Sequence, residues 1–221
     1  MTTRAGFQHE IAVLNEELAE MGTMIEEAIE RSFQAVEKED REEAEEIIKG
    51  DRRVNDMEKV IEARCLSLIL KQQPVVAGEL RIVTTALKVV TDMERIGDHA
   101  ADIAELVLRM DSTAIYKQIQ DIPQMAEAAK MMVHDAVHAF VQCDVEAARK
   151  NISKDDIVDA LFNNVKEEIV NHLKNDTRHI DECIDIIMIA KYLERIADHA
   201  VNICEWTEFH ETGELNHIRL V

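Results

Sequence analysis

An eleven-residue acidic segment occurs twice in this chain of 221 residues, and the second copy begins one hundred residues after the first. The copies run from Met93 to Ile103 and from Leu193 to Ile203, and seven of their eleven positions are identical. A shift of 104 also aligns residues 21–54 with 125–158, with identities at Met21, Ala35, Asp40, Glu42, Ala44, Ile48, Asp51 and Val54. The chain is therefore an internal duplication, and we expect both copies to fold alike.

Each copy has the periodicity of long amphipathic helices. Apolar residues in the first segment recur every three or four positions, at Ile11, Leu14, Leu18, Met21, Ile25, Ala28 and Ile29. We predict six helices, over about 7–36, 41–71, 79–110, 122–142, 145–174 and 178–209. Asp40, with Glu43 three residues later, is expected to cap the second helix, Asp144 the fifth, and Asp176 or Thr177 the sixth.

Helices of about thirty residues joined by short turns fold back as antiparallel neighbours. We therefore predict an all-α protein made of two tandem three-helix bundles. The first repeat should comprise residues 1–112 and the second residues 113–221, packed together as one compact unit. A coiled-coil rod is the rival architecture, but strict heptads are not maintained and the short connections favour compact bundles.

Charge and composition exclude several classes of function. A formal net charge of -20 would repel a nucleic-acid backbone. The longest run without Asp, Glu, Lys or Arg has eight residues, Ala136 to Cys143, so we expect no membrane insertion and no signal peptide. No Cys-x-x-Cys pair occurs among Cys65, Cys143, Cys183 and Cys204, and a reducing cytoplasmic location is expected.

Each repeated segment places oxygen-bearing side chains four residues apart, which puts them in one stripe on a helix. The first stripe is Glu94, Asp98 and Asp102, and the second is Glu194, Asp198 and Asn202. Apolar residues such as Ile96, Ala100 and Ile103 fall on a separate arc of the helix. The stripes should therefore lie beside the core and not inside it.

The preceding helix of each copy carries a matching pair, Asp51 with Asn55 and Asp155 with Asp159. An antiparallel hairpin could bring each pair opposite a stripe and assemble several hard oxygen ligands, of the type that suits Mg, Mn, Ca or oxygen-ligated Fe. The alternative is a solvated acidic face neutralised by the basic side chains Arg95, Arg195 and Lys191. Repetition of the spacing in both copies strengthens the metal interpretation, and both alternatives stay open.

No residues for catalysis or for an organic cofactor are predicted. His99 and His199 point about 100° away from the stripes on a helix, so we expect them to pack or cap and not to ligate. Phosphate-binding loops, nucleophile elbows and His-Glu-x-x-His motifs do not occur. The Glu-x-x-His signature of di-iron bundles is missing from these helices.

The whole chain, as two three-helix repeats that each end in Glu-Arg-Ile-x-Asp-His-Ala, resembles the PhoU family of phosphate-specific transport accessory proteins. The resemblance implies a cytoplasmic, non-enzymatic negative regulator of the phosphate-starvation response that associates as a homodimer or larger oligomer. Its implied partners are the ATPase of the phosphate ABC transporter and a membrane sensor histidine kinase. The alternative function is a carboxylate-bridged metal enzyme or a metal-storage bundle.

The resemblance also implies metal clusters on Glu/Asp-x-x-x-Asp motifs, which correspond here to Glu94 with Asp98 and Glu194 with Asp198. The cation would be divalent or trivalent, such as Fe, Zn, Mn or Mg. The full predicted ligand set is Glu94, Asp98, Asp102, Asp51, Glu194, Asp198, Asn202, Asp155 and Asp159. Asn202 stands where the first copy has Asp102, and Asn55 stands where the second has Asp159, so the two sites should differ in affinity.

Overall fold

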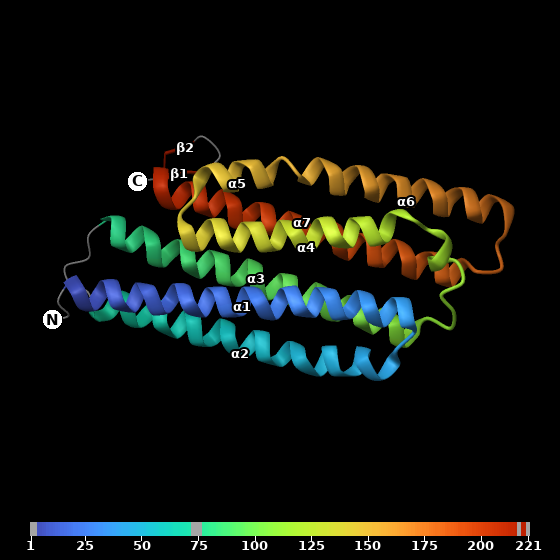
Figure 1. Cartoon of the computed structure of the whole chain (residues 1–221), viewed down its shortest axis with the longest axis horizontal. Helices are drawn as coiled ribbons and strands as arrows, with labels where there is room; N and C mark the ends of the chain where they lie inside the picture. The colour runs from blue at the N-terminus through green and yellow to red at the C-terminus, as the bar shows by residue number, and fades with distance from the viewer. Residues whose placement is uncertain (1–3, 72–76, 216–217, 220–221) are drawn as a thin grey trace.

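The computed structural model describes residues 4–71, 77–215 and 218–219, and it consists of long helices lying side by side (Figure 1). The first half contains α1 (Arg4–Lys38), α2 (Arg41–Lys71) and α3 (Ala77–Arg109). The second half contains a short 3₁₀ turn η1 (Tyr116–Gln118), then α4 (Asp121–Gln142), α5 (Val145–Ile152), α6 (Asp155–Asn175) and α7 (Ile180–Thr212). This confirms the predicted all-α helical bundle.

Two features depart from the predicted pattern of six uninterrupted helices. A short antiparallel pair, β1 (Glu214–Leu215) and β2 (Ile218–Arg219), follows α7. The predicted fifth helix is divided into α5 and α6. At this break Asn151 is buried where the first copy has the core residue Ile47, and its Nδ2 donates to the Met132 carbonyl at 2.7 Å. Ser153 Oγ donates to the Lys150 carbonyl at 2.7 Å and competes with the helix backbone.

Two of the three predicted helix caps are confirmed. The Glu43 amide donates to Asp40 Oδ1 at 3.0 Å, and the Ala147 amide donates to Asp144 Oδ1 at 3.0 Å. The third prediction was wrong, because Asp176 accepts from the Arg178 amide at 2.9 Å in a local turn and α7 begins only at Ile180. An Asx-type turn at the end of one helix uses the same residue types as a cap at the start of the next.

The halves share one hydrophobic core. α3 packs against α7 and α1 packs against α4, and the buried side chains of both halves form one continuous cluster. A Cβ on Gly22 of α1 would lie 2.9 Å from Val137 Cγ1 of α4, so the missing side chain permits that close approach. No helix among the described residues is long and apolar enough to cross a bilayer.

The seam between α3 and α7 is lined by the two histidines of the repeated segment. The ring of His99 lies 5.7 Å from that of His199 and 5.5 Å from that of Tyr192, measured between centroids. His199 Nδ1 lies 2.8 Å from Asp92 Oδ1. Asp92 and Tyr192 occupy equivalent positions in the two copies, so each histidine meets the other copy's residue at that position. Both histidines have the packing role that the sequence predicts.

Candidate metal centres

The first acidic cluster lies between α2 and α3 and comprises Asp51, Asn55, Glu58, Glu94 and Asp98. Its helices come close because α3 has glycine at position 97, where a Cβ would stand 3.0 Å from Val54 Cγ1 and 3.5 Å from Asp51 Oδ1. The prediction that an antiparallel hairpin brings Asp51 and Asn55 to the first stripe agrees with this packing.

Two oxygen atoms of the first cluster accept no hydrogen bond from any described residue. Asn55 Nδ2 donates to Asp51 Oδ2 at 2.9 Å, which leaves Asp51 Oδ1 and Asn55 Oδ1 buried and unpaired. A buried acceptor without a partner costs about 1–3 kcal/mol. The donor set is made of hard oxygen atoms, and a cation would satisfy both of these acceptors.

Negative charge accumulates in this cluster. The pKa values of Asp51 and Glu94 are both raised, first by burial and then by the charge of Asp98. Burial, followed by the charge of Glu62, also raises the pKa of Glu58. Arg95 is the predicted counter-charge and reaches Asp98 Oδ2 at 3.0 Å and Glu94 Oε2 at 3.5 Å. Its side chain is 56% exposed, so this counter-charge lies at the outer edge of the cluster.

The second acidic cluster occupies the equivalent place between α6 and α7 and comprises Asp155, Asp159, Glu194 and Asp198. Burial raises the pKa of Asp155 to about 6, with the charges of Asp159 and Asp198 adding to the effect. Burial and then the charge of Glu194 raise the pKa of Asp198. Lys191 forms an ion pair with Glu194 at one side of the cluster. Both copies therefore bring carboxylates of two helices into one electrostatic group.

The last member of each predicted stripe has a partner at the seam. Asp102 Oδ2 lies 3.2 Å from His99 Nδ1, and Asn202 Nδ2 donates to Asp92 Oδ1 at 3.0 Å. Asp102 also contributes to the raised pKa of Asp51, so it stands at the border of the first cluster. Asn202 thus uses its amide nitrogen at the seam.

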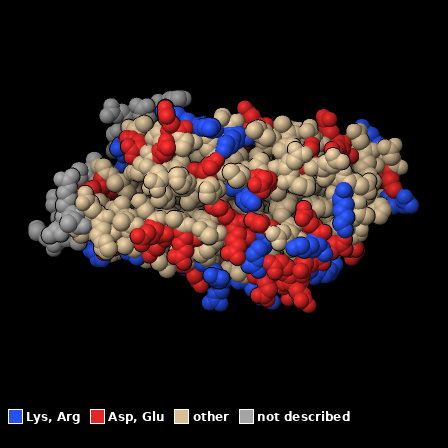
Figure 2. Space-filling view, in the orientation of Figure 1, with Lys and Arg blue, Asp and Glu red and all other residues tan. Residues whose placement is uncertain are grey.

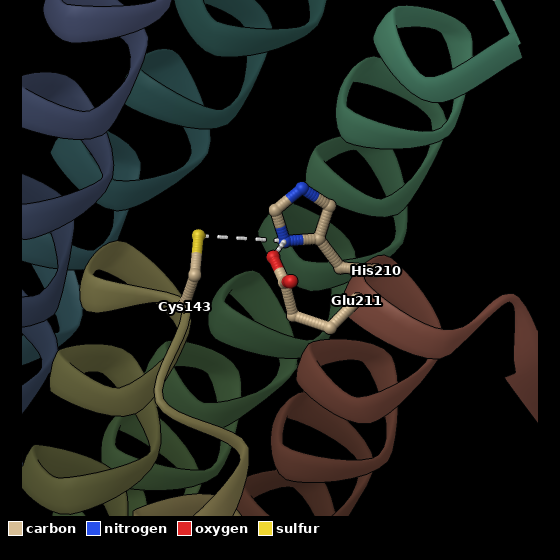
Figure 3. Close-up of side chains that lie close together, drawn as sticks. All are labelled: Cys143, His210 and Glu211. Atoms are coloured by element: carbon tan, nitrogen blue, oxygen red, sulfur yellow. Dashed lines mark hydrogen bonds and ion pairs between the residues drawn. The ribbon is translucent and has the colours of Figure 1, made fainter.

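Ligand atoms converge most closely at a third place that the sequence did not indicate. In the part of the chain that the structure describes, only Cys143, His210 and Glu211 form a group of three His, Cys, Asp or Glu side chains whose ligand atoms all lie within 4.8 Å of one another (Figure 3). Among the described residues, no three carboxylates of either acidic cluster bring ligand oxygens this close to one another. Cys143 and His210 are 67 residues apart in the chain, so no local spacing could have revealed the group. Glu58 was also missed, although it continues the face of Asp51 and Asn55 by one turn.

Comparison with known proteins gives matches that span both copies. The family model of the PhoU domain matches residues 18–107 and again residues 122–207. The chain is 37% identical over 212 residues to a phosphate-specific transport system accessory protein PhoU homolog from Clostridium acetobutylicum, covering 96% of this chain and 97% of that protein. It is 28% identical over 208 residues to the phosphate-specific transport system accessory protein PhoU of Escherichia coli, covering 94% of this chain and 86% of that protein.

Solved structures give the same result. The crystal structure of the phosphate transport system regulatory protein PhoU from Streptococcus pneumoniae superposes with a TM-score of 0.88 at 30% identity, covering 96% of this chain and 100% of that one. The crystal structure of PhoU from Pseudomonas aeruginosa gives a TM-score of 0.85 at 27% identity, covering 94% of this chain and 100% of that one. The likeness therefore extends over nearly the whole bundle and is not restricted to the repeated segment.

Proposed function

The chain belongs to the PhoU family, and from this premise we propose that it is a non-enzymatic accessory regulator of phosphate uptake that represses the phosphate-starvation response. The observation that carries the proposal is the match of the family model to both repeats, at residues 18–107 and 122–207. Relatives matched over most of their length are named accessory or regulatory proteins of phosphate transport.

The proposed regulator acts in the cytoplasm by binding two proteins, the ATPase of the phosphate transporter and a membrane sensor histidine kinase, and it does so as a homodimer. Its surface chemistry favours basic partner surfaces. The net charge is -20, and Figure 2 shows carboxylates gathered over α2, where Glu42, Glu43, Glu45 and Glu46 lie close together in sequence. Complementary charge speeds and orients the association of proteins.

Co-purification tests the proposed partners. The tagged chain should retain the transporter ATPase and the sensor kinase from cells grown in high phosphate, and it should retain less of them after phosphate starvation. The salt dependence of retention should reveal the contribution of the acidic face, because added salt screens exposed charges. Failure to retain either protein under both conditions would contradict the proposed mode of action. Light scattering on the same preparation checks the dimer.

We further propose that each acidic cluster binds a divalent or trivalent cation, such as Mg, Mn, Fe or Zn. The first site would use Asp51, Asn55, Glu94 and Asp98, and the second Asp155, Asp159, Glu194 and Asp198. Asp102 and Asn202 would border them. Unpaired buried oxygens in the first cluster and the raised pKa of Asp155 in the second support the proposal. A bound cation would supply the positive charge that both groups need.

Metal content tests these sites. Protein purified without chelator or nickel affinity should contain metal, and Glu94→Ala/Asp98→Ala should lose the share held by the first cluster. Glu42→Ala/Glu46→Ala is the matched control, since it removes two exposed carboxylates of the same spacing from α2. Added cation should raise the melting temperature of the wild type, because a ligand of the folded state stabilises it. Equal metal content in the two double variants would count against the first site.

A further inference from the structure

A group of different chemistry lies where α4 and α7 end. Cys143 terminates α4, and His210 and Glu211 belong to the last turn of α7 (Figure 3). Cys143 Sγ lies 3.5 Å from His210 Nδ1, which lies 3.6 Å from Glu211 Oε1. Asp198 is twelve residues earlier on the same helix, about 18 Å away at 1.5 Å per residue. The group is therefore separate from the second acidic cluster.

The arrangement does not suit thiol catalysis. A catalytic Cys and His need the orienting carboxylate on the imidazole nitrogen that faces away from the sulfur. Here the sulfur and the carboxylate both approach Nδ1. Three ligand atoms this close together suit a bound metal ion better than a proton relay.

The sulfur–nitrogen distance matches that around a small tetrahedral ion. Zinc bonds of about 2.3 Å to sulfur and about 2.0 Å to nitrogen, at the tetrahedral angle, place the two ligand atoms about 3.5 Å apart. Cys143 Sγ and His210 Nδ1 are separated by 3.5 Å. The sulfur and the imidazole nitrogen are therefore already at the separation of two ligands of one zinc ion.

The surroundings hold the imidazole and leave the site open to solvent. Only 10% of the His210 side chain is exposed, and its ring lies 6.1 Å from that of Phe140, measured between centroids. Cys143 and Glu211 are exposed, so an ion can enter from water. Among the described residues, Arg81 lies near the group, and it donates from Nη2 to the main-chain carbonyl of Glu211 at 3.3 Å. A thiolate and a carboxylate together carry more charge than the Arg81 guanidinium.

We propose that Cys143, His210 and Glu211 bind a borderline-soft divalent cation of the Zn²⁺ class, with a fourth position open to water. Thiolate and imidazole ligands select such ions over Mg²⁺ and Ca²⁺. On binding, the thiol proton passes to solvent and a sulfur–metal bond replaces it. The ion would join the end of α4 to the end of α7. This site does not depend on the proposed function of the protein.

Cobalt is the probe that distinguishes this site from the acidic clusters. Metal-free wild-type protein titrated with Co²⁺ should develop one equivalent of thiolate-to-cobalt charge-transfer absorption, and Zn²⁺ should displace it. Carboxylate sites cannot produce this band. Cys143→Gly should abolish it, and the variant should stay folded because Cys143 has a φ of 55°, a conformation that glycine adopts readily.

His210→Gln should weaken Zn²⁺ binding, measured by competition with a chromophoric chelator, by at least about 10-fold, since loss of a partner that only orients a ligand already costs that much. His138→Gln is the matched control, because it removes an exposed histidine of α4 outside the ligand group, and it should bind as the wild type does. The proposal is overturned if the wild type gives no charge-transfer band, or if Cys143→Gly and the wild type bind Zn²⁺ and Co²⁺ identically.

Discussion

Asp155 begins α6 half-buried beside the carboxylates of Asp159 and Asp198, and its pKa is raised from 3.8 to about 6. The folded state therefore binds this proton more tightly than the unfolded chain does. Ionised Asp155 destabilises the metal-free fold above about pH 6, and this penalty disappears as the pH falls towards 4. The conflict between burial and charge at this residue is what a bound cation would relieve.

Asp155→Asn should thus stabilise the metal-free protein at pH 7 by about 1 kcal/mol, a value reduced from the full shift because the half-buried side chain is partly screened by solvent. The gain should be small at pH 4. Urea unfolding at both pH values measures it. Asp56→Asn is the control, since Asp56 is exposed and paired only with Arg52 and Lys59, and it should change stability by less than about 0.5 kcal/mol. A loss of stability in Asp155→Asn at pH 7 would mean that the carboxylate is well paired.

At the residue scale, the sequence predicted which carboxylates share a face but not which groups they meet. Four-residue spacing is a property of one helix, so Glu94 with Asp98 and Asp155 with Asp159 could be identified from the chain alone. The partner of Asn202 could not be identified from the sequence. It is Asp92, which belongs to the other copy and comes close to Asn202 only because α3 packs on α7.

At the scale of elements, the close contact of α1 with α4 depends on Gly22. Alanine there would place its Cβ 2.9 Å from Val137 Cγ1, and the branched valine side chain has little room to rotate. Gly22→Ala should destabilise the fold by about 1–3 kcal/mol in spite of the better helix propensity of alanine. Denaturant unfolding measures this change.

Gly50→Ala supplies the matched comparison. A Cβ at position 50 of α2 would meet no atom within 4 Å, so only the helix propensity changes. This variant should gain about 0.5–1 kcal/mol. The changes in unfolding free energy should therefore have opposite signs in the two variants. A gain in stability from Gly22→Ala would show that α1 and α4 are less tightly packed than described.

Periodicity and caps predicted the long helices well, since these are local properties. The break between α5 and α6 could not be predicted in the same way, because the Asn151 side chain finds its acceptor on Met132 of another helix. Comparison of the two copies reveals a helix-end conformation that hydrophobic periodicity does not. Both α1 and α4 end in a residue of positive φ, Glu39 at 56° and Cys143 at 55°, and these positions are 104 residues apart.

On the scale of the whole molecule, the duplicated halves are joined into one core and carry their acidic clusters at equivalent places. Two similar amphipathic bundles bury more apolar surface together than apart, which favours such an arrangement for an internal repeat. The Cys143, His210 and Glu211 group was not predicted, since it requires the ends of α4 and α7 to meet. A site that forms only when distant elements pack together can be identified from a structure but not from local sequence patterns.

Disruption of the gene is the most direct test of the proposal that this chain represses the phosphate-starvation response. A phosphate-starvation reporter should stay high in the disruptant grown in rich phosphate, and expression of the wild-type chain should restore low output. Repression at the normal level in the disruptant, under the same rich-phosphate growth, would contradict the account.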